Sequence, residues 1–344
     1  MNCAVVGLGY WGPNLVRNLH ELEGAAVPLV CDLNESALST IQRRYPAVRT
    51  TTDLADVLND DDIEAVVIAT PVSTHHELAA ACLSAGKHVL VEKPLAGSTD
   101  EARDLIDLAD RSGLVLMPGH TFLYSPPVNM IRDLIRSQEL GEIYFISTSR
   151  VNLGLHQTDV SVIWDLGPHD FSILRYWLDE APAFVTAASR DCVGSGSPDV
   201  AFITLEYDSG VIAHVELSWL APSKLRRTTV VGSQKMVVYD DVSNEPVRLF
   251  DSGVTLPPPE SFGEFRLTYR TGDIVSPRVE SSEPLLLELR DFAQAVTTGG
   301  RPRSHAELGL DVVRVIETAH ESLARGGEKV GLLDTSRPRD MQAL

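Results

Sequence analysis

A glycine-rich turn near the start of the chain has the spacing that dinucleotide binding requires. The first glycine of a G-x-G-x-x-G motif makes the tight turn, the second lets the backbone approach a pyrophosphate, and the third lets a helix pack closely on the sheet. The N–H groups of that helix then face the phosphates. A glycine turn with a purely structural role is the alternative. The motif follows an apolar run, precedes a helical pattern, and consists of Gly7, Leu8, Gly9, Tyr10, Trp11 and Gly12.

An acidic residue stands where the second strand of such a domain ends. Asp32 lies 20 residues beyond Gly12, where a carboxylate binds the ribose hydroxyls of the adenosine. The same carboxylate would repel a 2′-phosphate, and the next residues, Leu33, Asn34 and Glu35, supply no cation. The sequence therefore predicts NAD as the cofactor, with NADP less favoured.

A lysine follows another expected strand at its carboxyl end. The segment is Glu92, Lys93 and Pro94, on the side where ligands bind in open α/β sheets. Lys93 can act as a general acid or base toward an alcohol or carbonyl if burial or a neighbouring charge lowers its pKa. A surface ion pair at the end of a strand is the alternative.

Asp165 and His169 form the third candidate group. They are four residues apart, so on a helix they share a face. Such a pair can transfer protons or bind adjacent hydroxyl groups of a sugar. A metal pair and simple helix capping are the alternatives, but no third metal ligand stands out, and we predict no metal.

The elements that position these residues alternate in the first third of the chain. Apolar runs at 4–7, 27–31, 65–69, 88–91 and 114–117 predict buried parallel strands. Capping boxes at 74–77 and 98–101, with Gly86 and Gly113 at helix ends, predict helices between them. Strand and helix repeated in this way predict a doubly wound α/β domain, which we place at residues 1–122.

The pattern changes near residues 124–127, and residues 123–344 form the predicted second domain. A helix is expected at 128–137, and two more at 283–297 and 305–323. Tight turns predict antiparallel hairpins of 201–207 with 211–219 and of 225–231 with 235–239. The stretch 251–263, rich in Pro and Gly, is expected to be a loop. This half is therefore predicted to be an antiparallel α+β domain.

Composition narrows the function classes. The chain has 344 residues, 44% of them hydrophobic, and a formal charge of −19, which argues against nucleic acid as a partner. A local pocket can still oppose that sign and bind an anionic substrate. The four cysteines are scattered, which predicts neither disulfides nor a zinc site. We see no secretory signal and no membrane-length apolar run, so we expect a cytoplasmic protein.

These elements, in this order, resemble the Gfo/Idh/MocA family of oxidoreductases, which includes glucose-fructose oxidoreductase and inositol dehydrogenase. The Glu-Lys-Pro segment with the later Asp-x-x-x-His is the specific part of the resemblance. It covers nearly the whole chain, through segments 5–9, 69–75, 86–95 and 165–170.

The resemblance implies roles for individual residues. Lys93 would be the catalytic acid/base, assisted by His169, and Asp165 would orient substrate or share in proton transfer. Glu92 would contact the nicotinamide ribose, and a cis peptide before Pro94 would aim Lys93. Three further residues would line the cofactor, namely Thr70, Pro71 and His75. The second domain would hold an open-faced, mostly antiparallel sheet that binds substrate and pairs subunits into a homodimer or homotetramer.

The substrate is expected to be a small molecule, a sugar or cyclitol. Segments 150–157 and 162–164 are similar to the branch that acts on nucleotide-linked sugars, often at C3, which predicts a 3-dehydrogenase or 3-ketoreductase. Alternatives are an inositol, aminocyclitol or free-sugar dehydrogenase, an NAD-dependent redox-neutral glycoside hydrolase, and a non-catalytic NAD-binding regulator. The pocket would hold Lys93, Asp165 and His169 together with Tyr124, Arg150, Asn152 and His156.

Overall fold

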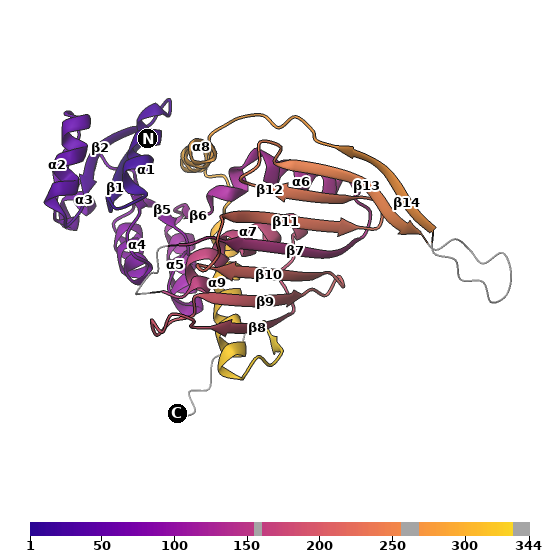
Figure 1. The fold of residues 1–344 in the computed structure, drawn as a ribbon. Coiled ribbons are helices and arrows are strands. Elements are labelled where there is room, and N and C mark those ends of the chain that lie inside the picture. Colours follow the sequence, from indigo (N-terminus) through magenta and orange to yellow (C-terminus); the bar gives the residue numbers. More distant parts are fainter. Residues whose placement is uncertain (155–159, 256–267, 333–344) are drawn as a thin grey trace. The chain divides into compact units, whose positions relative to one another are not determined.

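The computed structural model describes residues 1–154, 160–255 and 268–332 (Figure 1). The chain folds into two compact units, and each combines separate segments of sequence. The first contains Met1–Asn129 and Glu280–Val313, and the second contains Met130–Val279 and the chain from Arg314 onward. The division into consecutive domains, 1–122 and 123–344, stays a prediction.

A six-stranded parallel sheet forms the centre of the first unit. Its strand order, β3-β2-β1-β4-β5-β6, is that of a dinucleotide-binding doubly wound fold. Continuous apolar runs produce strands that are buried on both faces, and the five predicted strands are confirmed to within a few residues. They are β1 (Asn2–Val6), β2 (Ala26–Cys31), β4 (Ala65–Ile68), β5 (His88–Glu92) and β6 (Leu116–Gly119). The short polar edge strand β3 (Arg49–Thr51) was not predicted, because it has no apolar run.

Local capping residues set the ends of several helices in this unit. The Ser98 hydroxyl accepts the Glu101 N–H, and Gly113 ends the helix with φ +64°, as expected. The capping box predicted at Thr74 is wrong, because a 3-10 turn precedes the helix and the Thr74 hydroxyl donates to the Pro71 carbonyl instead. The helical segments are α1 (Gly12–Glu21), α2 (Glu35–Arg44), α3 (Leu54–Leu58), η1 (Val72–Thr74), α4 (His75–Ser84), α5 (Thr99–Ser112), η2 (Thr121–Tyr124) and α8 (Pro284–Thr298).

A nine-stranded sheet forms the second unit. Both predicted hairpins are confirmed, β9 with β10 and β11 with β12. All neighbouring strands are antiparallel except β7 and β10, so the sheet is mixed rather than fully antiparallel. In sheet order the strands are β14 (Thr268–Val275), β13 (Val247–Thr255), β12 (Met236–Asp240), β11 (Leu225–Gly232), β7 (Ile143–Val151), β10 (Ile212–Ser218), β9 (Val200–Glu206), β8 (Phe184–Arg190) and β15 (Val330–Gly331).

The loop predicted at 251–263 is wrong over its first five residues. Residues 251–255 belong to β13, which pairs with β14. The two strands are not separated by a short turn of the kind that marks a hairpin in the sequence, because residues 256–267 lie between them. The remainder of that predicted loop lies outside the described residues.

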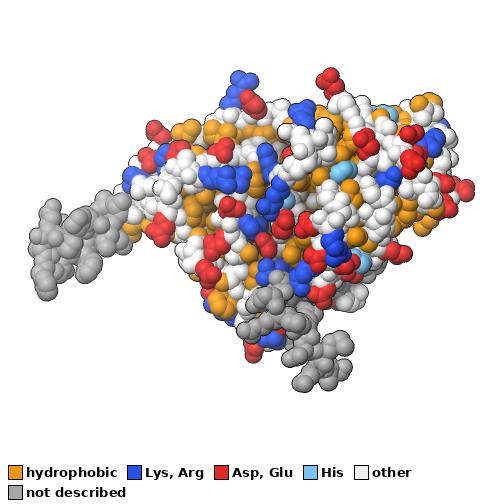
Figure 2. All heavy atoms as spheres, turned by 180° about the vertical axis from the view of Figure 1, so that it is seen from behind, with side chains coloured by type: hydrophobic (Ala, Val, Ile, Leu, Met, Phe, Trp, Pro, Cys, Tyr) orange, Lys and Arg blue, Asp and Glu red, His pale blue; other side chains and the backbone are white. Residues whose placement is uncertain are grey.

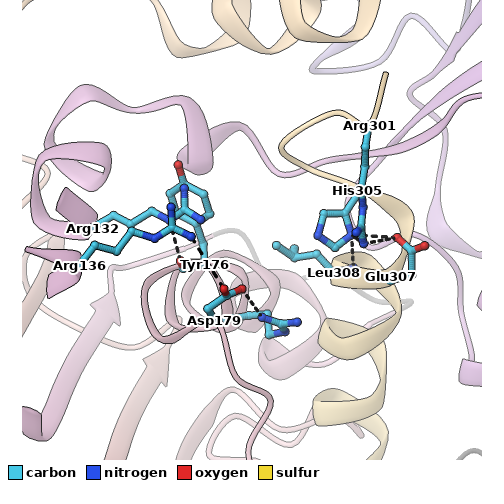
Figure 3. Close-up of polar contacts among 9 residues, drawn as sticks. Arg132, Arg136, Tyr176, Asp179, Arg301, His305, Glu307 and Leu308 are labelled. Atoms are coloured by element: carbon cyan, nitrogen blue, oxygen red, sulfur yellow. Dashed lines mark hydrogen bonds and ion pairs between the residues drawn. The ribbon is translucent and has the colours of Figure 1, made fainter. Parts of the chain in front are cut away.

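Helices pack on one face of the nine-stranded sheet. Helix α7 (Val162–Leu178) contacts β7, β9 and β10. Arg132 of α6 (Pro126–Arg136) donates through Nε to the Tyr176 carbonyl at 3.1 Å and stacks on that ring, while Arg136 and Arg175 both contact Asp179 (Figure 3). These contacts join the last turns of α6 and α7. The third long helix, α9 (Ala306–Ala324), contributes its first residues to the first unit and the rest to the second.

The opposite face of this sheet carries exposed apolar side chains. Residues alternate along each strand, so Ile146, Ile203 and Val215 are buried while their neighbours point away. The strand pairings put four large side chains on this outer face, with 42–48% of their surface exposed, namely Phe145, Phe184, Phe202 and Ile212. We call these four residues the free-face residues.

Candidate active site

Each glycine of the N-terminal motif has a separate reason to be glycine. A Cβ at Gly7, whose φ is +93°, would lie 2.5 Å from the Ala69 carbonyl oxygen, and one at Gly12 would lie 2.2 Å from the Gly7 oxygen. Backbone packing therefore requires both. A Cβ at Gly9 would meet no described atom beyond its neighbours within 4 Å, so Gly9 leaves open backbone for a ligand. The loop fits a pyrophosphate.

The Asp32 side chain is hydrogen-bonded to this loop. Its carboxylate accepts the backbone N–H of Leu8 and, at 2.7 Å, that of Asn34. The two aromatic residues of the motif, Tyr10 and Trp11, lie at the rim, with Tyr10 86% exposed. The structure thus brings the expected cofactor residues after β1 and β2 together.

The turn after β4 contains Thr70 and Pro71, and His75 lies beneath it. Only 1% of the His75 surface is exposed. Its Nδ1 lies 2.8 Å from the Pro94 carbonyl oxygen and its Nε2 lies 2.9 Å from the Thr70 carbonyl oxygen. Within the chain His75 thus contacts the turns that follow β4 and β5.

Glu92 ends β5 and is buried, with Lys93 following it. The pKa of Glu92 is raised to about 7. Burial is the main cause, and it outweighs the opposing effects of the Lys93 charge and of the Lys93 N–H. Gly119 on the neighbouring strand β6 makes room, because a Cβ there would lie 3.2 Å from the Glu92 Cα. The peptide bond between Lys93 and Pro94 is cis, as the resemblance implied.

The structure adds a buried polar cluster that the sequence did not reveal. His120 follows β6, is 1% exposed, and has no hydrogen-bond partner for either ring nitrogen among the described residues. Burial and, to a smaller extent, the charge of Lys93 lower its pKa to about 3. Glu288 of α8 is fully buried and accepts the Thr121 hydroxyl at 2.8 Å. Burial, reinforced by Glu92, holds the pKa of Glu288 well above its ordinary value.

One signal could have identified Glu288. It lies on the apolar face of α8, three residues after Leu285 and four before Phe292, and both of those are buried. An acidic residue on such a face needs a partner or a proton.

Asp165 and His169 lie on α7 in the second unit, one helical turn apart as predicted. Both are partly buried. The indole Nε1–H of Trp219, which follows β10, donates to Asp165 Oδ2 at 3.0 Å. Asp165 is therefore oriented by a buried aromatic residue far along the sequence.

The other predicted pocket residues occupy different environments. Arg150 is buried and paired with Asp170, which also accepts the Thr148 hydroxyl at 2.7 Å. The Tyr124 hydroxyl donates to Asp291 and accepts the Ser304 N–H. Asn152 is partly buried, and His156 lies outside the described residues. Substrate contact by these four residues stays a prediction.

Over residues 1–154, 160–255 and 268–332 no group of three or more His, Cys, Asp or Glu side chains is arranged to hold a metal ion. In the same ranges no helix combines the length and the apolar character needed to cross a membrane.

The three buried cysteines, Cys3, Cys31 and Cys82, are free thiols, and Cys192 is free and exposed. Acidic and basic side chains are interspersed over the face seen in Figure 2.

Comparison with known proteins adds to this geometry. Residues 1–120 match the GFO_IDH_MocA family, described as an oxidoreductase family with an NAD-binding Rossmann fold, and residues 128–238 match the GFO/IDH/MocA C-terminal domain. D-xylose 1-dehydrogenase (NADP(+)) 2 of Haloferax volcanii is 30% identical over 281 residues, which are 78% of this chain and 81% of that protein. Inositol 2-dehydrogenase 2 of Saccharopolyspora erythraea is 30% identical over 224 residues, 63% and 66% of the two chains.

One solved structure is similar to this chain over nearly its whole length. The crystal structure of GenD2 from gentamicin A biosynthesis, in complex with NAD, has a TM-score of 0.83 and 26% identity, with 97% of each chain covered. The glycine loop, the strand order and the two matching domains agree with these comparisons. The chain belongs to the Gfo/Idh/MocA family of NAD(P)-binding oxidoreductases.

Proposed function

We propose that this protein is an NAD-dependent dehydrogenase or ketoreductase that moves a hydride between nicotinamide and a hydroxyl-bearing carbon of a sugar or cyclitol. The observation that carries the proposal is the position of Lys93, directly after β5 at the carboxyl edge of the sheet where the glycine loop and Asp32 also lie. The relatives named for xylose and inositol act on polyhydroxylated substrates of that class.

In the oxidation direction Lys93 accepts the proton of the substrate hydroxyl. The carbon–hydrogen bond breaks at the same carbon, its electron pair leaves with the hydrogen as a hydride, and a carbonyl group forms. Bound nicotinamide supplies the hydride acceptor for oxidation and the donor for reduction. His169 assists the proton transfer, and Asp165, held by Trp219, orients the substrate. In reduction Lys93 returns the proton to the oxygen.

NAD is the cofactor we propose, because the adenosine end of the site is acidic. Burial and, to a smaller extent, the charges of Asp32, Asp53 and Asp56 raise the pKa of the Cys31 thiol to about 11. Three carboxylates therefore act on the end of β2, where a 2′-phosphate would have to lie. Their repulsion disfavours NADP.

Two substrate classes follow from different observations. The sequence of 150–157 favours a nucleotide-linked sugar, oxidised or reduced at C3. The likeness to GenD2 and to the inositol enzyme favours an aminocyclitol, inositol or free sugar. Arg150 is occupied by Asp170, so a nucleotide diphosphate would need other cationic partners.

We also propose a homodimer or homotetramer in the cytoplasm. The free-face residues place four exposed large apolar side chains on one side of the second unit's sheet, and a second copy of the same sheet can cover them by a two-fold contact. The free exposed thiol of Cys192 is compatible with a reducing compartment.

The proposal is tested by incubating the protein with NAD⁺ or NADP⁺ and a panel of UDP- and dTDP-sugars, inositols, aminocyclitols and free sugars, and following NADH absorbance. A rise with one class supports the proposal and assigns the substrate. The corresponding ketones with NADH test the reverse direction. No turnover in either direction, together with release of aglycone from glycosides at constant NAD, would replace it with a redox-neutral hydrolase. Binding of NAD without any turnover would replace it with a regulator.

A further inference from the structure

His75 makes two contacts of the same kind from opposite sides of its ring. Both partners are backbone carbonyl oxygens, that of Pro94 at 2.8 Å from Nδ1 and that of Thr70 at 2.9 Å from Nε2. A carbonyl oxygen accepts and cannot donate, whereas a neutral imidazole has a single N–H. Both contacts are hydrogen bonds only if the ring carries two protons, and otherwise one of the two carbonyls receives the bond.

The two carbonyls belong to the turns that form the site. Pro94 directly follows Lys93, and Thr70 follows β4 and begins the turn expected to line the cofactor. Thr70 is further tied to Thr74, the residue before His75, because their hydroxyl oxygens lie 2.8 Å apart. One buried side chain therefore spans the cofactor turn and the lysine turn.

We propose that His75 is a positioning residue that holds the Lys93–Pro94 turn against the Thr70–Pro71 turn and so keeps the Lys93 amine in place for proton transfer. The single N–H of the neutral ring donates to the Pro94 oxygen and so acts on Lys93, while Nε2 lies against the Thr70 carbonyl at the other end of the ring. This inference rests on the proposed catalytic role of Lys93.

The environment of His75 sets which form of the ring is present. Burial lowers the pKa of His75, the two carbonyl contacts oppose that effect, and the charge of Lys93 lowers the pKa further. In a buried neutral ring whose proton is on Nδ1, that N–H donates a hydrogen bond to the Pro94 carbonyl oxygen.

Two amide substitutions separate the two contacts. The Asn side chain places its NH₂ near the former Nδ1, and the longer Gln side chain places it near the former Nε2. His75→Asn therefore keeps a donor for the Pro94 oxygen, and His75→Gln keeps one for the Thr70 oxygen. His76→Gln is the matched control, because His76 is the next residue on α4 and its Nε2 instead contacts the partly exposed Asp104 at 2.8 Å.

Four measurements on the full-length protein are compared across these variants: kcat, the pH profile of kcat/KM, the Kd for NAD, and Tm. The Asn variant and the control should stay within about threefold of wild type in kcat. The Gln variant should lose roughly tenfold or more in kcat and show a displaced pH profile, because a displacement of about 1 Å can cost about 10²-fold. Its Kd for NAD and its Tm should match those of the Asn variant.

Equal losses in the Asn and Gln variants with an unchanged pH profile would overturn the proposal, as would no loss in either. A readout without substrate keeps the test independent of the proposed reaction. Competitive acetylation of lysines, followed by mass spectrometry across pH, reports the reactivity of Lys93 alone. A change in the Gln variant but not in the Asn variant supports the inference even if the substrate panel shows no turnover, and identical curves in wild type and both variants refute it.

Discussion

The carboxylate of Asp32 accepts the backbone N–H of Leu8, inside the glycine loop, while its other oxygen accepts the N–H of Asn34. The acid that is expected to bind ribose is therefore also the residue that connects the end of β2 to the phosphate-binding turn. The loop geometry and the proposed preference for NAD therefore depend on the same side chain.

Asp32→Asn should change the cofactor preference. The substitution keeps the size of the side chain but removes the charge that repels a 2′-phosphate and the strong acceptor for the ribose hydroxyls. We expect kcat/KM for NAD to fall roughly tenfold to a hundredfold, about 1.4–2.8 kcal/mol, and the NADP-to-NAD ratio to rise at least about tenfold. Glu35→Gln, on the exposed start of α2, is the control. An unchanged ratio in the Asp32 variant would mean that this acid does not face the ribose.

Lys93→Met should abolish turnover while leaving cofactor binding intact. Loss of a general acid/base costs about 10²–10⁴-fold in kcat, whereas the Kd for NAD should stay within about threefold. Lys224→Met, at an exposed lysine, is the control. If Lys93 and His169 serve one proton transfer, the double variant with His169→Asn should be little slower than Lys93→Met. Turnover near the wild-type rate without Lys93 would refute the assignment.

Glu92 should make the cofactor-free protein less stable as the pH rises. Its pKa is about 7 in the folded protein and 4.5 ordinarily, so between these values the unfolded chain has lost a proton that the folded protein keeps. The contribution is fully favourable below about pH 4.5 and is lost as the pH rises toward 7, by at most about 3 kcal/mol. Urea unfolding at pH 5 and 7.5 should show the full loss in wild type and in the exposed control Glu23→Gln, and a smaller loss in Glu92→Gln, where buried Glu288 still has a raised pKa. Parallel pH dependence in all three proteins would exclude Glu92 as its source.

Arg150→Met should destabilise the second unit. Removing one partner of a buried ion pair leaves the other charge uncompensated, which costs about 3–5 kcal/mol. Arg227→Met provides the comparison, because Arg227 pairs with Asp240 from a side chain that is 46% exposed and should cost about 1 kcal/mol or less. The additional change Asp170→Leu should recover much of the loss. A variant with wild-type Tm but a raised KM would instead show that Arg150 binds substrate.

Phe202→Asp, at one of the free-face residues, should shift the protein to a smaller oligomer. A carboxylate at the centre of an apolar two-fold contact meets its own copy across the axis, and burying both charges is costly. Light scattering coupled to size exclusion measures the mass directly. Val242→Asp, at an exposed apolar residue outside the strands, controls for the added charge. If wild type is already a monomer at working concentrations, the free face is not its assembly surface.

Local sequence patterns were sufficient for five of the six strands of the first sheet and for the glycine turn, but not for the polar edge strand β3. Buried parallel strands read as continuous apolar runs, and the glycine spacing has a geometric cause that the Cβ distances at Gly7 and Gly12 display. The same local patterns located the two hairpins, since each has its turn between its strands.

Non-local contacts account for part of what the sequence did not show. Glu288 reaches Thr121 across 167 residues, and Trp219 reaches Asp165 across 54. Such contacts depend on the tertiary fold, and no spacing rule predicts them.

Two other misses are local. No short turn separates β13 from β14, so residues 251–255 looked like part of a loop. The capping box expected at Thr74 is absent because its hydroxyl donates to the nearby Pro71 carbonyl.

The return of residues 280–313 to the first unit has a consequence for synthesis. The ion pair of Arg17 with Glu283 and the bond from Tyr124 to Asp291 join the earliest part of the chain to residues made much later. On the ribosome the first unit therefore stays incomplete until residue 313 has been translated, although its six strands are all made before residue 120. The edge strand β15, at residues 330–331, joins the second unit later still.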